Sequence, residues 1–341
     1  MDQSIALILL QDGIVNGAIY ALLALCLVMV FAVTRVILIP QGEFVSFAAL
    51  TYATLDTGHV PASLFLLGGL GAAAFIRSVW STRGRALLWL VAETLLLPAL
   101  ISAVTIWLAP QKPGVALEAL MALAITAPLA PYLYRLAFQP LANASVLVLL
   151  IASVGAHLAL GGIGLLIFGP EGSRGPNFSS AMLSLGDQTI PGQSLWIMGL
   201  TIVAMAALFV FFEFTLLGTA LRAVAVNRLG ARLVGIRTEQ AGLLAFTLAG
   251  ILGALSGVLV APLTTIYYDS GFLIGLKGFV AAIVGGLASY PLAVLAALVV
   301  GLVESFSAFW ASAFKEVIVF TVIIPVLLWR SWRHQDVEDE E

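Results

Sequence analysis

Long runs of apolar residues dominate this chain and limit what it can fold into. A helix needs about 20 apolar residues to cross the roughly 30 Å hydrocarbon core of a membrane, and shorter runs fit broken or re-entrant helices. Eleven runs qualify: 13–34, 42–56, 61–76, 86–108, 115–134, 146–169, 193–217, 241–264, 272–288, 291–309 and 315–330. They are apolar on every side, whereas strands of a membrane barrel alternate apolar and polar residues. The sequence therefore predicts an all-α, polytopic integral membrane helix bundle with roughly 10–11 spans or re-entrant segments in a single domain over residues 1–341.

Composition excludes the main soluble classes of protein. Hydrophobic residues make up 61% of the 341 residues and charged residues 10%, too little polar surface to cover a water-soluble globule. The 15 Lys and Arg against 18 Asp and Glu give no basic field for nucleic acid. One cysteine, Cys26, and three separated histidines offer no metal site, and the sequence contains no phosphate-binding Gly-x-x-x-x-Gly-Lys-Ser/Thr loop. We therefore expect no enzyme and no cofactor in this chain, so that ATP-driven transport would need a separate ATPase.

The basic residues between the apolar runs predict the orientation, because cytoplasmic loops carry the excess of Lys and Arg. With the C-terminus inside, eleven arginines are cytoplasmic: Arg35, Arg77, Arg83, Arg85, Arg135, Arg222, Arg228, Arg232, Arg237, Arg330 and Arg333. Only Lys112, Arg174 and Lys315 then lie outside. We therefore expect a multi-pass protein with its N-terminus out, its C-terminus in, and an acidic cytoplasmic tail over residues 331–341.

Two connecting segments are long enough to have a role of their own. Residues 170–192 are rich in Gly, Pro and Ser and are expected outside, as a lid, a docking surface or a spacer. Residues 217–240 are the most basic segment and combine arginines with Ala, Val and Leu at helical spacing. This second segment fits either an anchor on lipid headgroups or a helix presented to a cytoplasmic partner.

Ionisable residues inside apolar runs are costly in lipid, so they tend to face a protein interior or a water-filled path. Glu43, Lys277 and Glu304 are the three such residues singled out here. The alternative to a place on a transport path is a structural role for each residue, either in an ion pair or at a helix end where the side chain reaches water. Lys277 and Glu304 are expected at a similar depth in the membrane, so that they could pair. His157 is expected to be a neutral packing residue with one hydrogen bond.

A weak internal repeat and spaced glycines add to this pattern. In the first copy, a long apolar run is followed by a broken connection and by a short run that begins at Gly42-Glu43-Phe44. In the second copy, the long run is 241–264, and the short run after the connection contains Lys277-Gly278-Phe279. The two pairs would have opposite orientations, which is typical of transporters whose path lies between inverted repeats. Close helix contacts are expected at glycines three or four residues apart: Gly250, Gly253, Gly257, Gly271, Gly275 and Gly278.

Three blocks carry a resemblance to a known family. They are Asn16-Gly17-Ala18-Ile19-Tyr20-Ala21-Leu22 with Gln41-Gly42-Glu43, then Arg222-Ala223 through Leu233-Val234-Gly235-Ile236, and then Gly275-Leu276-Lys277-Gly278-Phe279 with Val284-Gly285-Gly286 and Glu304-Ser305. The chain resembles the first membrane permease of high-affinity branched-chain amino acid ABC importers, a family that includes urea and short-chain amide permeases. It departs from the family at Ile39-Pro40-Gln41, at a possible extra helical hairpin over residues 77–113, and at Val226 and Asn227, where an acidic residue is common.

The resemblance implies a permease that moves a small solute inward by alternating access. The implied partners are a second homologous permease, two ATPase subunits that bind ATP and Mg²⁺, and a soluble solute-binding protein outside a bacterial inner membrane. The expected path residues are Tyr20, Gln41, Gly42, Glu43, Lys277, Gly278 and Glu304. The expected ATPase-coupling residues, in the docking loop 217–240, are Arg222, Val226, Asn227, Arg228, Gly230, Leu233, Gly235 and Ile236. An ion-coupled secondary transporter is the alternative, and the solute is left open between a branched-chain amino acid, urea, an amide and an aromatic acid.

Overall fold

The computed structural model describes residues 3–80, 84–185, 188–287 and 289–328. The expected acidic tail, 331–341, lies outside these residues, as do Arg83, Arg330 and Arg333. All eleven apolar runs are helical within the described part of the chain, so the expected all-α membrane bundle is confirmed. Seven helices there are long and apolar enough to span a membrane, and several shorter ones lie between them.

The helices of the first half follow the predicted runs, except that α1 begins well before residue 13. They are α1 (Gln3–Thr34), α2 (Gln41–Asp56), α3 (Ser63–Val79), α4 (Arg85–Val91), α5 (Leu97–Leu108), α6 (Val115–Thr126), α7 (Leu129–Leu133) and α8 (Val146–Phe168). A π-helical turn, Ala92–Leu96, joins α4 to α5, and another, Tyr134–Phe138, follows α7. Helices α4 and α5 therefore form one long rod, Ala86–Gln111, and α6 and α7 form another, Val115–Leu141.

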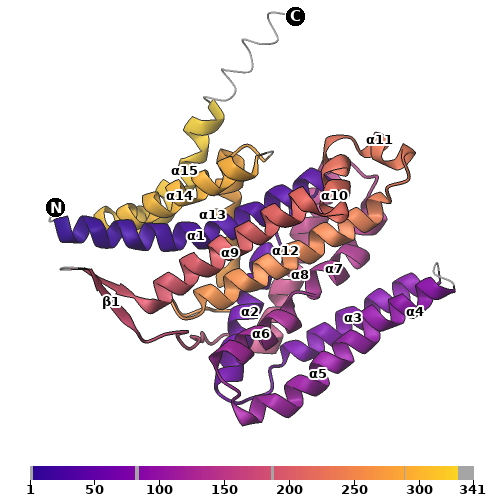
Figure 1. The fold of residues 1–341 in the computed structure, drawn as a ribbon, viewed down its shortest axis with the longest axis horizontal. Helices are drawn as coiled ribbons and strands as arrows, with labels where there is room; N and C mark the ends of the chain where they lie inside the picture. Colours follow the sequence, from indigo (N-terminus) through magenta and orange to yellow (C-terminus); the bar gives the residue numbers. More distant parts are fainter. Residues whose placement is uncertain (1–2, 81–83, 186–187, 288, 329–341) are drawn as a thin grey trace, which may run out of the picture.

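The second half contains the remaining spans and the two connecting segments noted above. Its elements are β1 (Met182–Leu185), β2 (Gln188–Pro191), α9 (Gly192–Phe214), α10 (Leu216–Val226), α11 (Arg228–Leu233), α12 (Thr238–Val260), α13 (Ser270–Val284), α14 (Tyr290–Trp310) and α15 (Lys315–Thr321). The expected external loop therefore contains an antiparallel hairpin of β1 and β2. Figure 1 shows this hairpin and α11 at opposite ends of the molecule.

Helix α1 forms the axis of the bundle. Most of it is enclosed, and it packs along α14, α12 and α13. Contact with α14 is close because a Cβ atom on Gly13 would meet the main chain of Leu302, and one on Gly17 the main chain of Leu298. Beyond its first turns, where Leu7, Ile8 and Leu10 are exposed, the long hydrophobic helix near the N-terminus is therefore an internal element of the fold.

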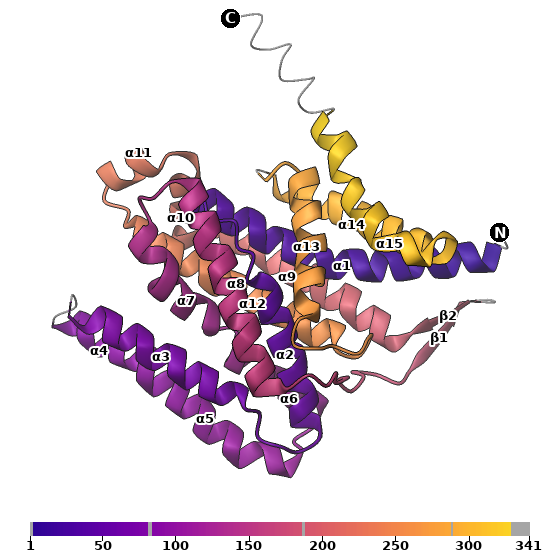
Figure 2. The ribbon, with the colours of Figure 1, turned by 180° about the vertical axis from the view of Figure 1, so that it is seen from behind.

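A helical hairpin, α3 with α4 and α5, lies to one side of this core (Figures 1 and 2). It packs on α6 and α7, and Gly71 of α3 meets the main chain of Thr94 and the ring of Pro98. Its outer face exposes large apolar side chains such as Leu88, Leu100 and Trp107, as a surface in contact with lipid does. The segment expected as an extra hairpin, 77–113, is not a hairpin by itself: it contains the end of α3 and one rod, Ala86–Gln111, which pairs with α3 as the second arm of this unit.

The spaced glycines predicted to mark close helix contacts do so. Gly250 lies against Ala127 and Ala130, while Gly253 and Gly257 lie against α2. Gly271 and Gly275 meet the first turn of α2, and Gly278 meets Leu23 of α1. This prediction of close packing is therefore confirmed, and the contacts place α2 and α13 between α1 and α12.

Candidate functional site

The two short helices α2 and α13 meet at their N-terminal turns in the middle of the bundle. Gln41 at the start of α2 lies beside Gly275, whereas Ser46 lies beside Gly271 at the start of α13, so the two turns run antiparallel. A Cβ atom on Gly42 would meet the main chain of Gly271 and Phe272. Both helices begin after a break in the chain, and their positive dipole ends therefore overlap inside the protein.

Polar groups from α8 hold the broken connection before α2. Ser153 accepts a hydrogen bond from the backbone N–H of Ile39 (3.0 Å) and donates one to the carbonyl of Ile37 (2.6 Å). His157, one helical turn further along α8, hydrogen-bonds through Nδ1 to Oε1 of Glu43 at 2.5 Å. Backbone groups freed by the break are thus partly satisfied by side chains from a neighbouring helix, as an interrupted membrane helix requires.

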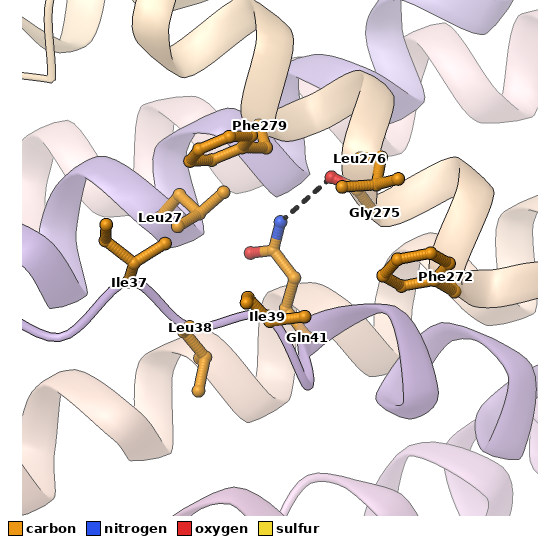
Figure 3. Close-up of a pocket in the computed structure, with 9 residues that line it drawn as sticks. All are labelled: Leu27, Ile37, Leu38, Ile39, Gln41, Phe272, Gly275, Leu276 and Phe279. Carbon is orange, nitrogen blue, oxygen red and sulfur yellow. Dashed lines mark hydrogen bonds between the residues drawn. The ribbon is translucent and has the colours of Figure 1, made fainter. Parts of the chain in front are cut away.

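Gln41 is buried, and the oxygen of its side-chain amide has no hydrogen-bond partner among the described residues. Its Nε2 donates to the carbonyl of Gly275 at 3.3 Å, whereas Oε1 has no hydrogen-bond partner among the described residues although the residue is only 1% exposed. Figure 3 shows this oxygen directed into a cavity of about 70 Å³ between α1, α13 and the 37–40 connection. The other lining residues are apolar apart from Gly275: Leu27, Ile37, Leu38, Ile39, Phe272, Leu276 and Phe279. The cavity therefore offers one hydrogen-bond acceptor within aliphatic and aromatic walls.

Glu43 is the second buried acceptor on the first turn of α2. It is 2% exposed, and its Oε2 has no partner among the described residues. His157, which binds Oε1, also stacks on Phe272 of α13 with ring centroids 4.3 Å apart. The expectation of one hydrogen bond for His157 is met, and that bond is made to a candidate path residue.

A separate charged cluster lies between α13, α1 and α14. Lys277 Nζ donates to Oε1 of Glu304 at 2.5 Å and to Oε1 of Glu316 at 3.1 Å. The Tyr20 hydroxyl donates to the other carboxylate oxygen of Glu304. The expected pairing of Lys277 with Glu304 is therefore confirmed, and these buried charges satisfy one another, which offsets much of their desolvation cost.

The candidate path residues thus fall into two groups. Gln41, Gly42 and Glu43 lie at the crossing of the two short helices, whereas Tyr20, Lys277 and Glu304 form the charged cluster. Gly278 packs against Leu23 of α1 and offers no polar group. The sequence pattern did not assign Ser153, His157 or Glu316 to these groups. Ser153 and His157 come from a helix more than 110 residues away from the segment that they contact, and Glu316 comes from the helix after α14.

The basic segment folds as two short helices at one end of the bundle. Asn227 ends α10 and caps α11, since its Oδ1 accepts the backbone N–H of Gly230 at 2.8 Å. Gly235 follows α11 with φ of +89°, a conformation that favours glycine. Its arginines are held in place: Arg222 pairs with Glu213 at 2.9 Å, Arg228 donates to the carbonyl of Ala142, and Arg232 donates to Thr238.

Apolar side chains of the same segment point away from the protein. Val226 is 86% exposed and Leu233 is 82% exposed, and Leu229 and Val234 are exposed as well. Ile236 is partly buried and lines a hollow between α10 and α12. A capped helix that exposes apolar side chains beside hydrogen-bonded arginines is the kind of surface on which another protein docks.

Among the described residues, no three His, Cys, Asp or Glu side chains gather as they would around a metal ion. The polar side chains that the structure brings together offer hydrogen bonding and charge pairing within an apolar surround. They resemble the polar groups that fix the orientation of a small ligand in a mostly apolar pocket.

Comparison with known proteins places the chain among membrane permeases. Relatives include the high-affinity branched-chain amino acid transport system permease protein LivH of Escherichia coli K12, 27% identical over 335 residues, which span 93% of this chain and 91% of that protein. BraD of Pseudomonas aeruginosa, with the same description, is 26% identical over 94% of this chain and 92% of its own length. No solved structure matches the chain. Residues 9–327 match the family described as the branched-chain amino acid transport system permease component, so the chain is a multi-pass membrane permease that belongs to this family.

Proposed function

We propose that this permease is the membrane subunit of an ABC importer that carries a small zwitterionic solute inward. The proposal extends the family assignment, because relatives such as LivH and BraD are described as permease proteins of branched-chain amino acid transport systems. Two ATPase subunits would bind ATP and Mg²⁺, a second homologous permease would complete the channel, and a soluble binding protein would deliver the solute. The chain itself would hold no cofactor and catalyse no reaction.

The observation that carries the proposal is the crossing of α2 and α13. Short helices that begin inside a membrane protein leave backbone groups and dipole ends available to a solute, and opposed pairs of this kind occur where transporters bind their cargo. Here Gly42 and Gly271 allow the two N-terminal turns to overlap, and α1 and α12 enclose them. Rocking of one helix pair against the other would open this crossing alternately to the two sides of the membrane.

A branched-chain amino acid is the solute that we favour. The aliphatic and aromatic cavity beside Gln41 suits a branched hydrocarbon side chain. Gln41 Oε1 and Glu43 Oε2 are buried acceptors without partners among the described residues, and an α-ammonium group has three hydrogens to donate. Urea and simple amides would leave the apolar walls largely unused.

The docking surface for the ATPases would be formed by α11 and its flanks. Val226, Leu229 and Leu233 would bury their exposed side chains in the partner, and the cap at Asn227 would keep the helix rigid enough to transmit movement. This end of the molecule carries most of the arginines that predict a cytoplasmic location. We therefore propose a bacterial inner-membrane protein with its N-terminus outside and its C-terminus inside.

A substitution at Gly235 tests the coupling. Gly235→Leu strains the backbone after α11, because φ is +89° there, and should lower ATP-dependent uptake at least tenfold in proteoliposomes that contain all the subunits. The matched control is Gly114→Leu, since Gly114 has φ of +100°, open space around it and a position between α5 and α6. Equal uptake by the two variants would refute docking at α11. Uptake by the permease alone, driven by an ion gradient through Glu43 or Lys277, would instead establish the secondary transporter.

A further inference from the structure

A cleft at the end of the α3–α5 hairpin lies apart from the helix crossing and the charged cluster, and borders the last residues of the 217–240 segment. It consists of two adjoining hollows of about 710 and 440 Å³ between this hairpin and the core. The residues common to both hollows are Ser78, Arg135, Gln139 and Glu239. The cleft therefore lies where the end of α3 and the start of α4 approach the turn after α7 and the beginning of α12.

Three arginines from three separate elements line this cleft. Arg77 comes from the last turn of α3, Arg135 from the π-helical turn after α7, and Arg237 from the residue before α12. Arg77 lines the smaller hollow, Arg237 the larger one and Arg135 both. Segments far apart in the sequence thus bring three arginines to two adjoining hollows, and guanidinium groups are well suited to bind phosphate.

The acidic residues of the cleft are already engaged. Glu93 forms a 2.5 Å ion pair with Arg135, and Glu239 accepts a hydrogen bond from Nε2 of Gln139 at 3.2 Å. Arg77 and Arg237 form no ion pair with any described residue. Two guanidinium groups therefore lack an ion-pair partner among the described residues, and three arginines against two glutamates leave the cleft with one formal positive charge.

Two tryptophans indicate that the cleft opens at the membrane surface. Trp80 and Trp89 line its hollows, and they are 88% and 77% exposed. Tryptophan is enriched at the level of lipid headgroups, and arginines near the ends of spanning helices reach for the same level. Leu88, beside Trp89, exposes apolar surface that continues along the hairpin.

We propose that this cleft binds the phosphate headgroup of an anionic phospholipid. Arg77 and Arg237 would hold the phosphate, Arg135 would remain paired with Glu93, and the acyl chains would lie along the exposed apolar face beside Trp80 and Trp89. Free phosphate would leave this apolar surface unused. The bound lipid would join the α3–α5 hairpin to α12, and thereby attach the hairpin to the permease core.

Native mass spectrometry of the full-length protein in detergent tests the proposal. Phosphatidylglycerol and phosphatidylcholine are titrated into wild-type protein and into Arg77→Gln/Arg237→Gln, with Arg222→Gln/Arg232→Gln as a control of equal charge change away from the cleft. Wild type and control should bind phosphatidylglycerol in preference to phosphatidylcholine, and the cleft variant should bind it about 30-fold more weakly. Arg77→Lys/Arg237→Lys should retain most of the binding, which would show that charge in a folded cleft is responsible.

Two results would overturn the proposal. Equal phosphatidylglycerol affinity of the cleft variant and the control would show that the free arginines hold no lipid. Inorganic phosphate that competes with phosphatidylglycerol at millimolar concentration, and that loses affinity in the cleft variant, would show a site for a soluble phosphate instead.

Discussion

Gly42 and Gly271 lie so close that a methyl group on either would collide with the main chain of the other. This contact sets the distance between α2 and α13, and no side chain separates the two helices there. Gly271→Ala should lower the free energy of unfolding by about 1–3 kcal/mol, since added volume in a packed interior forces the backbone to move. The loss in uptake should be larger than the loss in folded protein, because the crossing must move during transport.

Gly155→Ala is the control for this change. Gly155 lies within α8, and no atom within 4 Å would meet an added Cβ. Thermal unfolding in detergent and uptake in proteoliposomes should both remain at the wild-type level for this variant. Wild-type uptake by Gly271→Ala would contradict the role of the crossing.

The pair formed by Lys277 and Glu304 predicts strong energetic coupling. Lys277→Met leaves the Glu304 carboxylate with the Tyr20 hydroxyl as its one remaining partner among the described residues. Removal of one member of a buried pair costs about 3–5 kcal/mol. Glu304→Gln should be costly for the same reason. In reversible unfolding, the double variant should lose about 0.5–3 kcal/mol less free energy of unfolding than the sum of the losses in the two single variants. Additive losses would mean that the two side chains do not interact in the folded protein.

Glu43 and Lys277 should behave independently. Glu43 has His157 as its partner, whereas Lys277 has Glu304 and Glu316. Glu43→Gln and Lys277→Gln should each reduce uptake, and a double-mutant cycle between them should give a coupling below about 0.5 kcal/mol. The cycle between Glu43→Gln and His157→Phe serves as the positive control. Wild-type uptake in both single variants would remove these residues from the transport path.

Labelling with a membrane-impermeant thiol reagent tests the proposed orientation. The buried Cys26 is first replaced by Ser, and single cysteines are introduced at Ser180, before the β1–β2 hairpin, and at Val226, at the end of α10. Both positions are exposed, and the adjoining elements, β1 and α10, lie toward opposite ends of the molecule (Figure 1). Ser180→Cys should react in intact cells, and Val226→Cys only after the membrane is opened. Reaction of both in intact cells would overturn the assignment of α11 to the cytoplasm.

The helices and one charged pair could be predicted from the sequence because they depend on local composition. Apolar runs predicted every spanning segment, and similar depth in two neighbouring helices predicted that Lys277 meets Glu304. The start of α1 was predicted ten residues too late, at residue 13 rather than Gln3, because Gln11 and Asp12 interrupt the apolar run. A helix that packs on α14 over much of its length tolerates such residues.

The contacts around the break before α2 could not be predicted in the same way. His157 and Ser153 lie more than 110 residues from the segment that they hold, and sequence spacing carries no information on such a contact. The pattern of Gly, Pro and Ser in 170–192 indicated a loop, yet the structure contains a strand pair there and a bridge from Ser173 to Ile266. Backbone hydrogen bonds of this kind depend on which segments the helices bring together.

The burial of α1 determines the order in which this protein can mature. Tyr20 is separated from its hydrogen-bond partner Glu304 by 284 residues. Gly13 and Gly17 likewise pack against Gly301, which is synthesised much later. During synthesis α1 enters the membrane long before α14 does, so its inner face is first covered by lipid or by the insertion machinery. The inner face of α1 reaches its final packing only when α14 takes the place of the lipid or the insertion machinery. A chain interrupted before residue 290 would leave a groove of small residues along α1, which an assembly factor or a protease can recognise.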